Sequence, residues 1–366
     1  MRLCTLAGSA CALLLAFLGA PSTSYAAESQ STAGSTNESI VFQRSVYVYT
    51  DPRAPDFGTA LFRVNPATRN VVQMTPLALN AYNRGGSWSP HGAKLVYEHY
   101  TQPRPDHSQL FVVDRQGTSH RITSGVALHE FAVWGPKAQI AFITDFGDQQ
   151  CLSAVRADGT NQRLLFCPLN QSTALRSPQW SLDGKSIYLA AARRSGSGVL
   201  SIIFRYDFAT RLATKIFSLG SYTGGIATIA PDGTHAIYTD TNLGPEVPAT
   251  LVDLTTGATT TLPGDFHGAK FSHDGRRIAF SRYETIDGTL YLSPYVMNAD
   301  GSNQHRVIDT PTPGASYTIM AWSKDNCHLL VDPYLDGNRV WIIDTESHQI
   351  AKVTKGMPNS TGWYEP

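Results

Sequence analysis

A short block of the form W-S-x-x-G, followed by an apolar run, recurs along this chain and limits its fold more than any other feature. Successive blocks begin 42 to 51 residues apart, which is the interval of a four-stranded blade in a β-propeller. We call the first residue of each block its anchor. The six anchors are Trp88, Trp134, Trp180, Ile229, Phe271 and Trp322.

Each block also predicts a local structure. Its anchor should end an inner strand and pack between neighbouring blades. The Asp-Gly pair that follows, such as Asp183-Gly184 or Asp274-Gly275, suits a tight turn, because Asp accepts hydrogen bonds from free backbone amides and Gly adopts positive φ. The apolar run after the turn then forms the second strand. We therefore expect an all-β chain.

A second repeated pattern, a hairpin made of an apolar strand, a polar turn and another strand, occurs seven times and gives the number of blades. Six anchors leave the first unit without an inner strand, and Trp363, 41 residues after Trp322, supplies the missing one. We predict a β-propeller of four-stranded blades, seven in number and closed by the C-terminal strand, which removes exposed sheet edges. Six blades would result if one unit did not fold as a blade. The seven hairpins are Leu61–Gln73, Leu110–Ile122, Leu152–Leu165, Ile203–Phe217, Leu251–Leu262, Tyr295–Ile308 and Val340–Val353.

The N-terminus has the features of a cleavable signal peptide. Arg2 gives a positive start, residues 11–18 are apolar but too few to span a bilayer, and Ser24-Tyr25-Ala26 offers the small residues that signal peptidase selects. Cleavage after Ala26 would export the mature chain to the periplasm or out of the cell. The predicted divisions are a signal peptide over residues 1–26, a flexible linker over 27–39 and one propeller domain over 40–366.

The charge balance excludes some classes of partner. The chain has 29 Lys and Arg residues against 29 Asp and Glu residues, so it has no basic excess to attract a nucleic acid. After the signal peptide, no apolar stretch approaches the length of a membrane span. We expect a monomer that binds no nucleic acid and has no membrane span.

Two cysteines are placed for a disulfide. Cys151 and Cys167 each lie eight residues from Gly159, the centre of a predicted hairpin turn. Residues directly opposed on antiparallel strands have Cα atoms about 4.5–5.5 Å apart, which suits a disulfide. In an oxidising compartment we predict this bond, with a stabilisation of about 3 kcal/mol. The alternative is a pair of packed thiols.

The repeat resembles that of a known family. The W-S-P-x-G turn at Trp88–Gly92 and the Y-V-x-x-x-x-G hairpin at Tyr295–Gly301 are similar to the propeller repeat of TolB-like proteins, and the resemblance covers residues 40–366. It implies an exported WD40-like β-propeller. TolB itself has an α/β domain before its propeller, and this sequence has no counterpart of it, so TolB's own role is not transferred.

The candidate binding surface follows from the blade plan. With strands A to D counted outward, the repeated A–B and C–D turns share one face, and the variable B–C and D–A loops share the other. Variable loops on a rigid frame commonly bind ligands, although polar strand ends are also ordinary solvated surface. The candidate ligand-binding residues at the strand ends on the variable loop face are Arg84, Glu98, His99, His129, Glu130, Arg176, Asp240, His267, Arg282 and Asp332.

Two functions are consistent with this surface. The first is a non-catalytic scaffold that binds a protein or an envelope glycan, since nearly all of the chain is repeat and we assign no catalytic residue, metal ligand or cofactor. The second is a metal-assisted polysaccharide lyase or hydrolase, because oligogalacturonide lyases resemble seven-bladed propellers with a histidine-rich metal site. Only His99, His129 and His267 support it. A propeller gating a peptidase would need a separate catalytic subunit.

Overall fold

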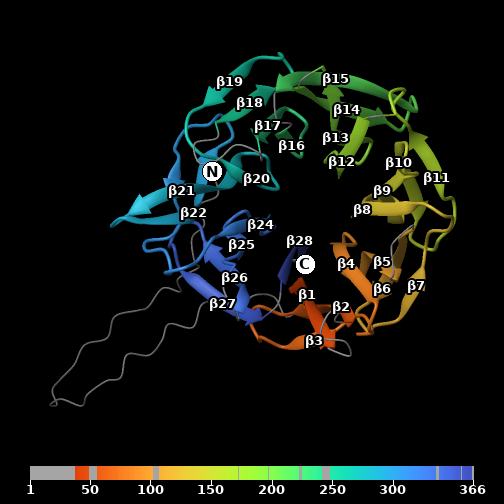
Figure 1. Ribbon diagram of the computed structural model, residues 1–366, viewed down its shortest axis with the longest axis horizontal. Coiled ribbons are helices and arrows are strands. Elements are labelled where there is room, and N and C mark those ends of the chain that lie inside the picture. The colour runs from red at the N-terminus through yellow and green to blue at the C-terminus, as the bar shows by residue number, and fades with distance from the viewer. Residues whose placement is uncertain are drawn as a thin grey trace, which may run out of the picture.

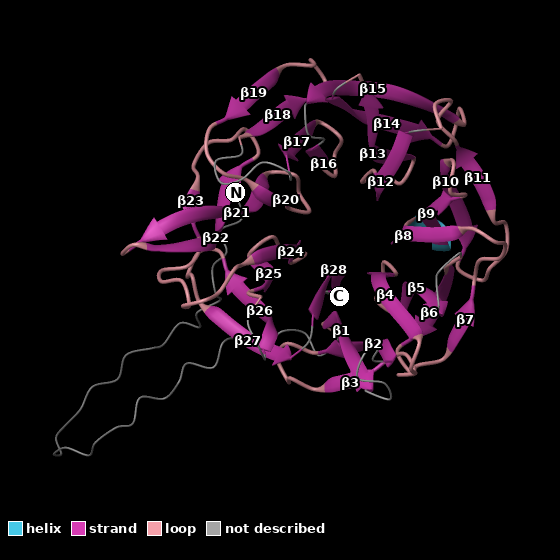
Figure 2. Cartoon of the chain, viewed as in Figure 1, coloured by secondary structure: helices cyan, strands magenta, loops and turns pink. Residues whose placement is uncertain are grey.

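The computed structural model is a ring of seven four-stranded antiparallel sheets (Figure 1). It describes residues 38–48, 56–101, 107–171, 173–196, 198–221, 225–240, 248–334, 338–355 and 357–364. The predicted all-β propeller with seven blades is confirmed. The described part contains one short 3₁₀ helix, Pro136–Ala138, and is otherwise strands and loops (Figure 2). It holds no helix long and apolar enough to cross a membrane.

Each blade runs from an inner strand at the ring's centre to an outer strand at its rim. Blade 1 is β28 (Met357–Tyr364), β1 (Ser39–Val48), β2 (Asp56–Val64) and β3 (Val71–Gln73); blade 2 is β4 (Ala81–Trp88), β5 (Lys94–Thr101), β6 (Gln109–Asp114) and β7 (Ser119–Arg121); blade 3 is β8 (Leu128–Trp134), β9 (Gln139–Asp145), β10 (Gln150–Arg156) and β11 (Arg163–Phe166).

The remaining four blades repeat this plan. Blade 4 is β12 (Thr173–Trp180), β13 (Ser186–Ser195), β14 (Gly198–Asp207) and β15 (Leu212–Ser221); blade 5 is β16 (Gly225–Ile229), β17 (His235–Asp240), β18 (Ala249–Asp253) and β19 (Thr259–Leu262); blade 6 is β20 (His267–Phe271), β21 (Arg277–Ile286), β22 (Thr289–Asn298) and β23 (His305–Arg306); blade 7 is β24 (Thr318–Trp322), β25 (His328–Asp332), β26 (Asn338–Asp344) and β27 (Ile350–Lys355).

The C-terminal strand closes the ring, as predicted. Strand β28 pairs with β1, with Trp363 opposite Ile40 and Tyr364 opposite Ser39. The first blade is thus built from both ends of the chain (Figure 1). Strand β1 begins at Ser39, one residue inside the predicted linker. The predicted signal peptide and linker residues up to 37 lie outside the described residues.

The anchor turns have the predicted chemistry. In blade 6, Ser272 Oγ donates to Asp274 Oδ1 (2.7 Å) and the Arg276 amide donates to the same oxygen (3.1 Å). Gly275 has a φ of 71°. In blade 7 the residue at the glycine position is Asn326, with a φ of 64°, which Asn tolerates better than most residues. The same side-chain pattern therefore closes successive A–B turns.

The anchors also join neighbouring blades. Trp322 Nε1 donates to the Lys270 carbonyl of blade 6 (3.0 Å), and Trp180 Nε1 donates to the Val133 carbonyl of blade 3 (3.4 Å). Trp322 is 3 % exposed and packs in an apolar cluster between blades 6 and 7. Because each sheet face is covered by the next blade, the hydrophobic core lies between blades.

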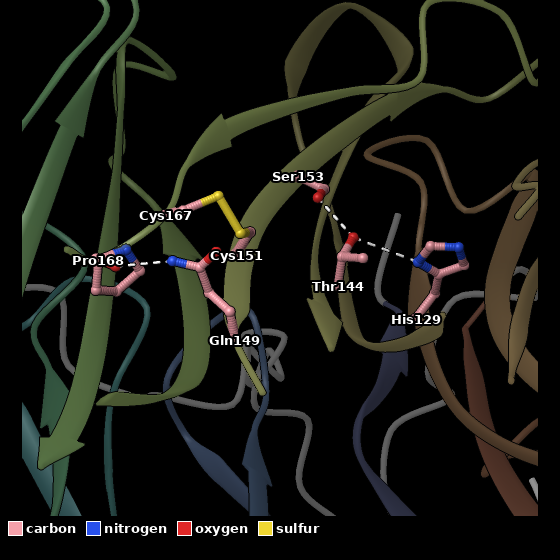
Figure 3. The surroundings of a disulfide bond; sticks show 7 residues. All are labelled: His129, Thr144, Gln149, Cys151, Ser153, Cys167 and Pro168. Carbon is pink, nitrogen blue, oxygen red and sulfur yellow. Dashed lines mark hydrogen bonds between the residues drawn. A yellow bond between two sulfur atoms is a disulfide. The ribbon is translucent and has the colours of Figure 1, made fainter. Parts of the chain in front are cut away.

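The predicted disulfide is present (Figure 3). Cys151 in β10 and Cys167, just beyond β11, are joined with their Cα atoms 4.3 Å apart. The register shifts between Leu152 and Ser153, yet Leu152 still faces Phe166, so the two cysteines are opposed as their symmetric spacing indicated. The bond ties the two outer strands of blade 3 together.

Candidate functional site

A β-bulge at the same position interrupts the inner strands of blades 2, 3, 4 and 6. The register shifts after Arg84 in β4, Glu130 in β8, Arg176 in β12 and His267 in β20. The next residue has positive φ in every case. The four bulge residues are Gly85 (71°), Phe131 (55°), Ser177 (47°) and Gly268 (60°).

Two of these bulges hold residues that ordinarily avoid this conformation. Glycine adopts positive φ freely, whereas another residue there costs roughly 1–2 kcal/mol. Phe131 is bulky, is 40 % exposed and has a φ of 55°. Backbone strain of this kind is concentrated at binding and active sites, where it fixes the direction of a side chain. The strain at Phe131 therefore makes it a candidate functional position.

Charged side chains from three consecutive blades meet at these bulges. Arg84 lies directly opposite Glu98 on the neighbouring strand, and Arg84 Nε donates to Glu98 Oε2 at 2.8 Å. The same guanidinium reaches into blade 3, where Nη2 donates to Glu130 Oε1 at 2.7 Å. With Phe131 and Arg176 of blades 3 and 4, these residues form what we call the channel cluster: Arg84, Glu98, Glu130, Phe131 and Arg176.

Glu98 is the buried centre of the channel cluster. It is 7 % exposed, and its second oxygen accepts a hydrogen bond from the Phe131 amide (2.7 Å). Burial raises the pKa of the Glu98 carboxyl, and Arg84 and the Phe131 amide offset this rise in part. Burial alone would lower the pKa of Arg84, but Glu98 and Glu130 outweigh it and raise that pKa. Both Glu98 oxygens are occupied by protein donors, so Glu98 holds the bulge of blade 3 against blade 2.

Phe131 and Arg176 are exposed members of the channel cluster, as is Arg84. The Arg176 guanidinium lies over the Phe131 ring, 5.7 Å from its centroid. Arg176 Nη1 also donates to the Leu175 carbonyl (2.9 Å) and to Gln150 Oε1 (3.3 Å). A guanidinium over an aromatic ring is a cation–π contact. Together they present a planar aromatic and cationic surface.

The channel cluster opens onto a cavity of about 440 Å³ lined mainly by the inner strands of blades 2 to 6. Its walls are mainly apolar, with few polar groups, which is the usual character of a ligand site. Glu98 and Lys270 bring charged side chains to it. The aromatic lining residues are Tyr97, Phe131, Trp134, Trp180 and Phe271.

His99 and His129, also predicted here, have structural partners. His99 Nδ1 is 2.9 Å from Asn83 Oδ1. His129 is 2 % exposed; its Nε2 lies 3.3 Å from the Ser124 carbonyl and its Nδ1 lies 3.3 Å from Thr144 Oγ1 (Figure 3). Burial lowers the pKa of both imidazoles. They are therefore neutral near pH 7 and connect strands within blades 2 and 3.

His267 and Arg282 lie near a second cavity, of about 620 Å³, between blades 5 and 6. His267 Nε2 is 2.8 Å from Asp265 Oδ1, and Asp265 Oδ2 accepts from the Tyr283 amide (3.0 Å). Asp265 and Arg282 line the cavity, and the Arg282 guanidinium lies 5.8 Å from the centroid of the Tyr295 ring. This second group is separate from the channel cluster.

The last two predicted residues lie at strand ends. Asp332 ends β25, is 5 % exposed, and accepts a hydrogen bond from the Tyr334 amide (2.9 Å), so it stabilises a turn. Asp240 ends β17, and its side chain lies outside the described residues. Of the ten predicted residues, the structure thus joins Arg84, Glu98 and Glu130, with Arg176 beside them.

The histidines predicted for a metal site do not form one in the part of the chain that the structure describes. No three His, Cys, Asp or Glu side chains of the described ranges are grouped so that they could hold a metal ion. His99 pairs with Asn83, His129 with Ser124 and Thr144, and His267 with Asp265.

The sequence patterns did not single out Phe131 or Lys270. Phe131 stands three residues before its anchor, where two other blades have Gly85 and Gly268. Lys270 stands directly before its anchor, where the other inner strands have uncharged residues. Aligning the repeats on their anchors would have marked both positions as departures. The residues equivalent to Lys270 are Ser87, Val133, Gln179, Thr228, Ala321 and Gly362.

No protein-family model and no curated protein sequence matches the chain. Solved structures share its fold. A puromycin hydrolase is 15 % identical over 88 % of this chain and 53 % of its own, with a TM-score of 0.61. An oligogalacturonate lyase in complex with manganese is 16 % identical over 65 % and 71 %, with a TM-score of 0.52. TolB from Acinetobacter baumannii is 14 % identical over 89 % and 82 %, with a TM-score of 0.49.

The TM-scores of 0.61 and 0.52 show a shared fold, and identities this low show nothing about activity. The chain spans about half the length of the puromycin hydrolase that it matches.

Proposed function

We propose that this chain is an exported, TolB-like, non-catalytic scaffold that binds a protein or an envelope glycan at the loop-face end of its central channel. The channel cluster carries the proposal, because it assembles charged and aromatic side chains from blades 2, 3 and 4 at the edge of a cavity. A rigid frame with convergent polar groups around an apolar cavity suits binding.

The arrangement inside the channel cluster supports binding more than catalysis. A general acid or base must have an atom free to exchange a proton with substrate. Glu98 instead has both oxygens bonded to protein groups, from Arg84 and Phe131. Phe131 and Arg176 are exposed, and their planar groups can stack on sugar rings or on peptide and aromatic side chains.

The disulfide between Cys151 and Cys167 supports the exported location in this proposal, because such bonds persist in oxidising compartments. The periplasm or the extracellular space would then supply the partner. In that setting the partner is an envelope protein or a glycan.

In-cell crosslinking tests the proposal. The tagged mature protein is crosslinked, and the captured species are identified by mass spectrometry. The variant Phe131→Ala/Arg176→Ala removes two exposed side chains of the channel cluster. The control Leu212→Ala/Lys215→Ala removes an apolar and a cationic side chain, both exposed, from outer strand β15.

We expect a partner protein or glycan that is captured by the wild type and by the control, and is lost with the channel variant. A partner captured equally by all three proteins would contradict the location of the site. In that case, stoichiometric Mn, Ca or Zn that disappears in a His99→Ala/His267→Ala variant would favour the alternative, a metal-assisted polysaccharide lyase or hydrolase.

A further inference from the structure

Lys270 is a charged side chain in an unusual place. It belongs to inner strand β20, is partly buried, and lines the same cavity as Phe131 and Trp180. The backbone around it is fixed on both sides, since Thr228 Oγ1 donates to the Ala269 carbonyl (2.9 Å) and Trp322 Nε1 donates to the carbonyl of Lys270 itself (3.0 Å). Its strand is therefore held in place by blades 5 and 7.

Within the ranges that the structure describes, the Lys270 ammonium has no hydrogen-bond acceptor or carboxylate in contact. Burial lowers the pKa of Lys270, and no neighbouring carboxylate counters this effect. This distinguishes Lys270 from Arg84, whose guanidinium binds Glu98 and Glu130. A partly desolvated cation without a partner is costly, and an anion in the cavity would offset that cost.

The rest of the cavity restricts which anion fits. Glu98 also lines it but is already paired with Arg84, so Lys270 supplies the charge with which a ligand can pair. One ammonium provides a single point charge, which suits a carboxylate better than a phosphate, whose binding usually requires several donors. The aromatic walls, including Phe131, Trp134 and Trp180, require an apolar or aromatic body. At about 440 Å³ the cavity has room for a small molecule or the end of a peptide.

We propose that the channel cavity binds a monocarboxylate with an apolar or aromatic body, with the carboxylate paired to Lys270 and the body packed on the aromatic walls. This inference rests on the proposed function in that it uses the same channel as the binding site. The carboxylate can come from a free organic acid or from the C-terminus of a peptide, and the two sources share the same chemistry.

Calorimetric titration of the purified mature protein tests this pairing with two matched pairs of probes. N-acetyl-phenylalanyl-phenylalanine and its C-terminal amide represent the peptide source. 3-Phenylpropionate and its amide represent the small acid. Each probe is titrated into the wild type, into Lys270→Met, and into the control Lys215→Met, which removes an exposed lysine on outer strand β15.

We expect at least one acid to bind the wild type and Lys215→Met about tenfold more tightly than its amide. In Lys270→Met that preference should disappear, because the acid weakens about tenfold while the amide is unchanged. The pair that shows the preference identifies the source. Methionine fills similar space without the charge. The urea midpoint of Lys270→Met is first compared with that of the wild type to check that the variant folds. Lys270→Arg, which keeps the charge, should keep the preference if Lys270→Met fails to fold.

Any of three results would overturn the carboxylate site. Acid and amide could bind the wild type equally, the preference for the acid could survive in Lys270→Met, or no probe could bind. The scaffold proposal fails separately. It is contradicted when crosslinking finds no partner that depends on Phe131 and Arg176, a result that leaves the carboxylate preference of the purified protein measurable.

Discussion

The two ends of the inner strands differ in how closely they repeat. At the anchor end, Ser181, Ser272 and Ser323 each donate to the aspartate two residues on, with nearly equal distances of 2.7, 2.7 and 2.6 Å. Four residues before the anchor, at the bulge end, the blades have different residues. From blade 2 to blade 7 these are Arg84, Glu130, Arg176, Gly225, His267 and Thr318.

This difference separates packing from recognition. The anchor end is buried between blades, so any change there disturbs two sheets at once. The bulge end faces the channel, where side chains can vary without opening a gap in the core. Repetition therefore marks what holds the ring together, and departure from repetition marks what the ring can bind.

Replacing an anchor should cause the largest loss of stability. We expect Trp322→Ala to lower the free energy of unfolding by about 3–5 kcal/mol, because a nearly fully buried indole leaves a cavity between blades 6 and 7. Phe131→Ala, at the bulge end, should cost at most about 1 kcal/mol, since the ring is 40 % exposed. Urea unfolding at pH 7 measures both.

A milder anchor variant refines this comparison. Trp322→Phe retains an aromatic ring but removes the donor to the Lys270 carbonyl, so we expect a loss of about 1 kcal/mol from the hydrogen bond, plus a smaller packing term. Similar losses for Trp322→Ala and Phe131→Ala would show that the two ends contribute equally to stability.

Exchanging the bulge residues of two blades should change stability by about 1 kcal/mol in opposite directions. Ser177 in blade 4 is exposed and has a φ of 47°, so Ser177→Gly should raise the unfolding free energy. Gly268 in blade 6 has a φ of 60°, and a Cβ there would meet nothing within 4 Å. Gly268→Ser should therefore lower the unfolding free energy through conformational strain alone.

Urea unfolding of the two single variants and of the double variant checks this. The bulges lie on different blades, so the effects should add, leaving the double variant near the wild type. Loss of stability in Ser177→Gly would mean that the bulge of blade 4 is held by something other than its backbone conformation.

The same contrast explains how much the sequence could predict. The seven blades, the closure through Trp363 and the disulfide all follow from the repeat period and from the symmetric cysteine spacing, which can be read directly from the sequence. The pairing of Arg84 with Glu98 is a cross-strand contact within one blade. By contrast, the bond from Arg84 to Glu130 depends on how blades 2 and 3 lie against each other. Strand ends alone could not separate these residues from His99, whose side chain bonds to Asn83.

Two residues of the channel were missed for a different reason. Phe131 is apolar and Lys270 stands beside its anchor inside β20, so a search for charged or titratable residues next to the variable loops passes over both. The bulge turns Phe131 toward the cavity, and bulges depend on local backbone geometry that a hydrophobic pattern does not record. The position of Lys270 in the channel is a consequence of ring closure.

The smallest expected effect is on the pH dependence of stability, which should differ in sign and in pH range between Glu98, near the bulge end, and Asp274, at the anchor end. The pKa of Glu98 is raised in the folded protein, so the folded state binds this proton more tightly than the unfolded chain does. This contribution favours folding at low pH and is lost as pH rises through the folded-state pKa. We therefore expect the wild type to gain stability relative to Glu98→Gln as pH falls from 7 toward 5, measured by urea unfolding of both proteins.

Asp274, at the anchor end, provides the matched control. Burial acts to raise its pKa, but hydrogen bonds from Ser272 and the Arg276 amide outweigh burial and lower it. Its stabilising contribution is complete above the unfolded-state pKa of about 3.9 and is lost only below it, so the wild type and Asp274→Asn should differ by a constant amount between pH 7 and 5. A flat difference for Glu98→Gln as well would mean that Arg84 fully compensates the burial of Glu98, and the channel cluster would then be no more strained than an anchor turn.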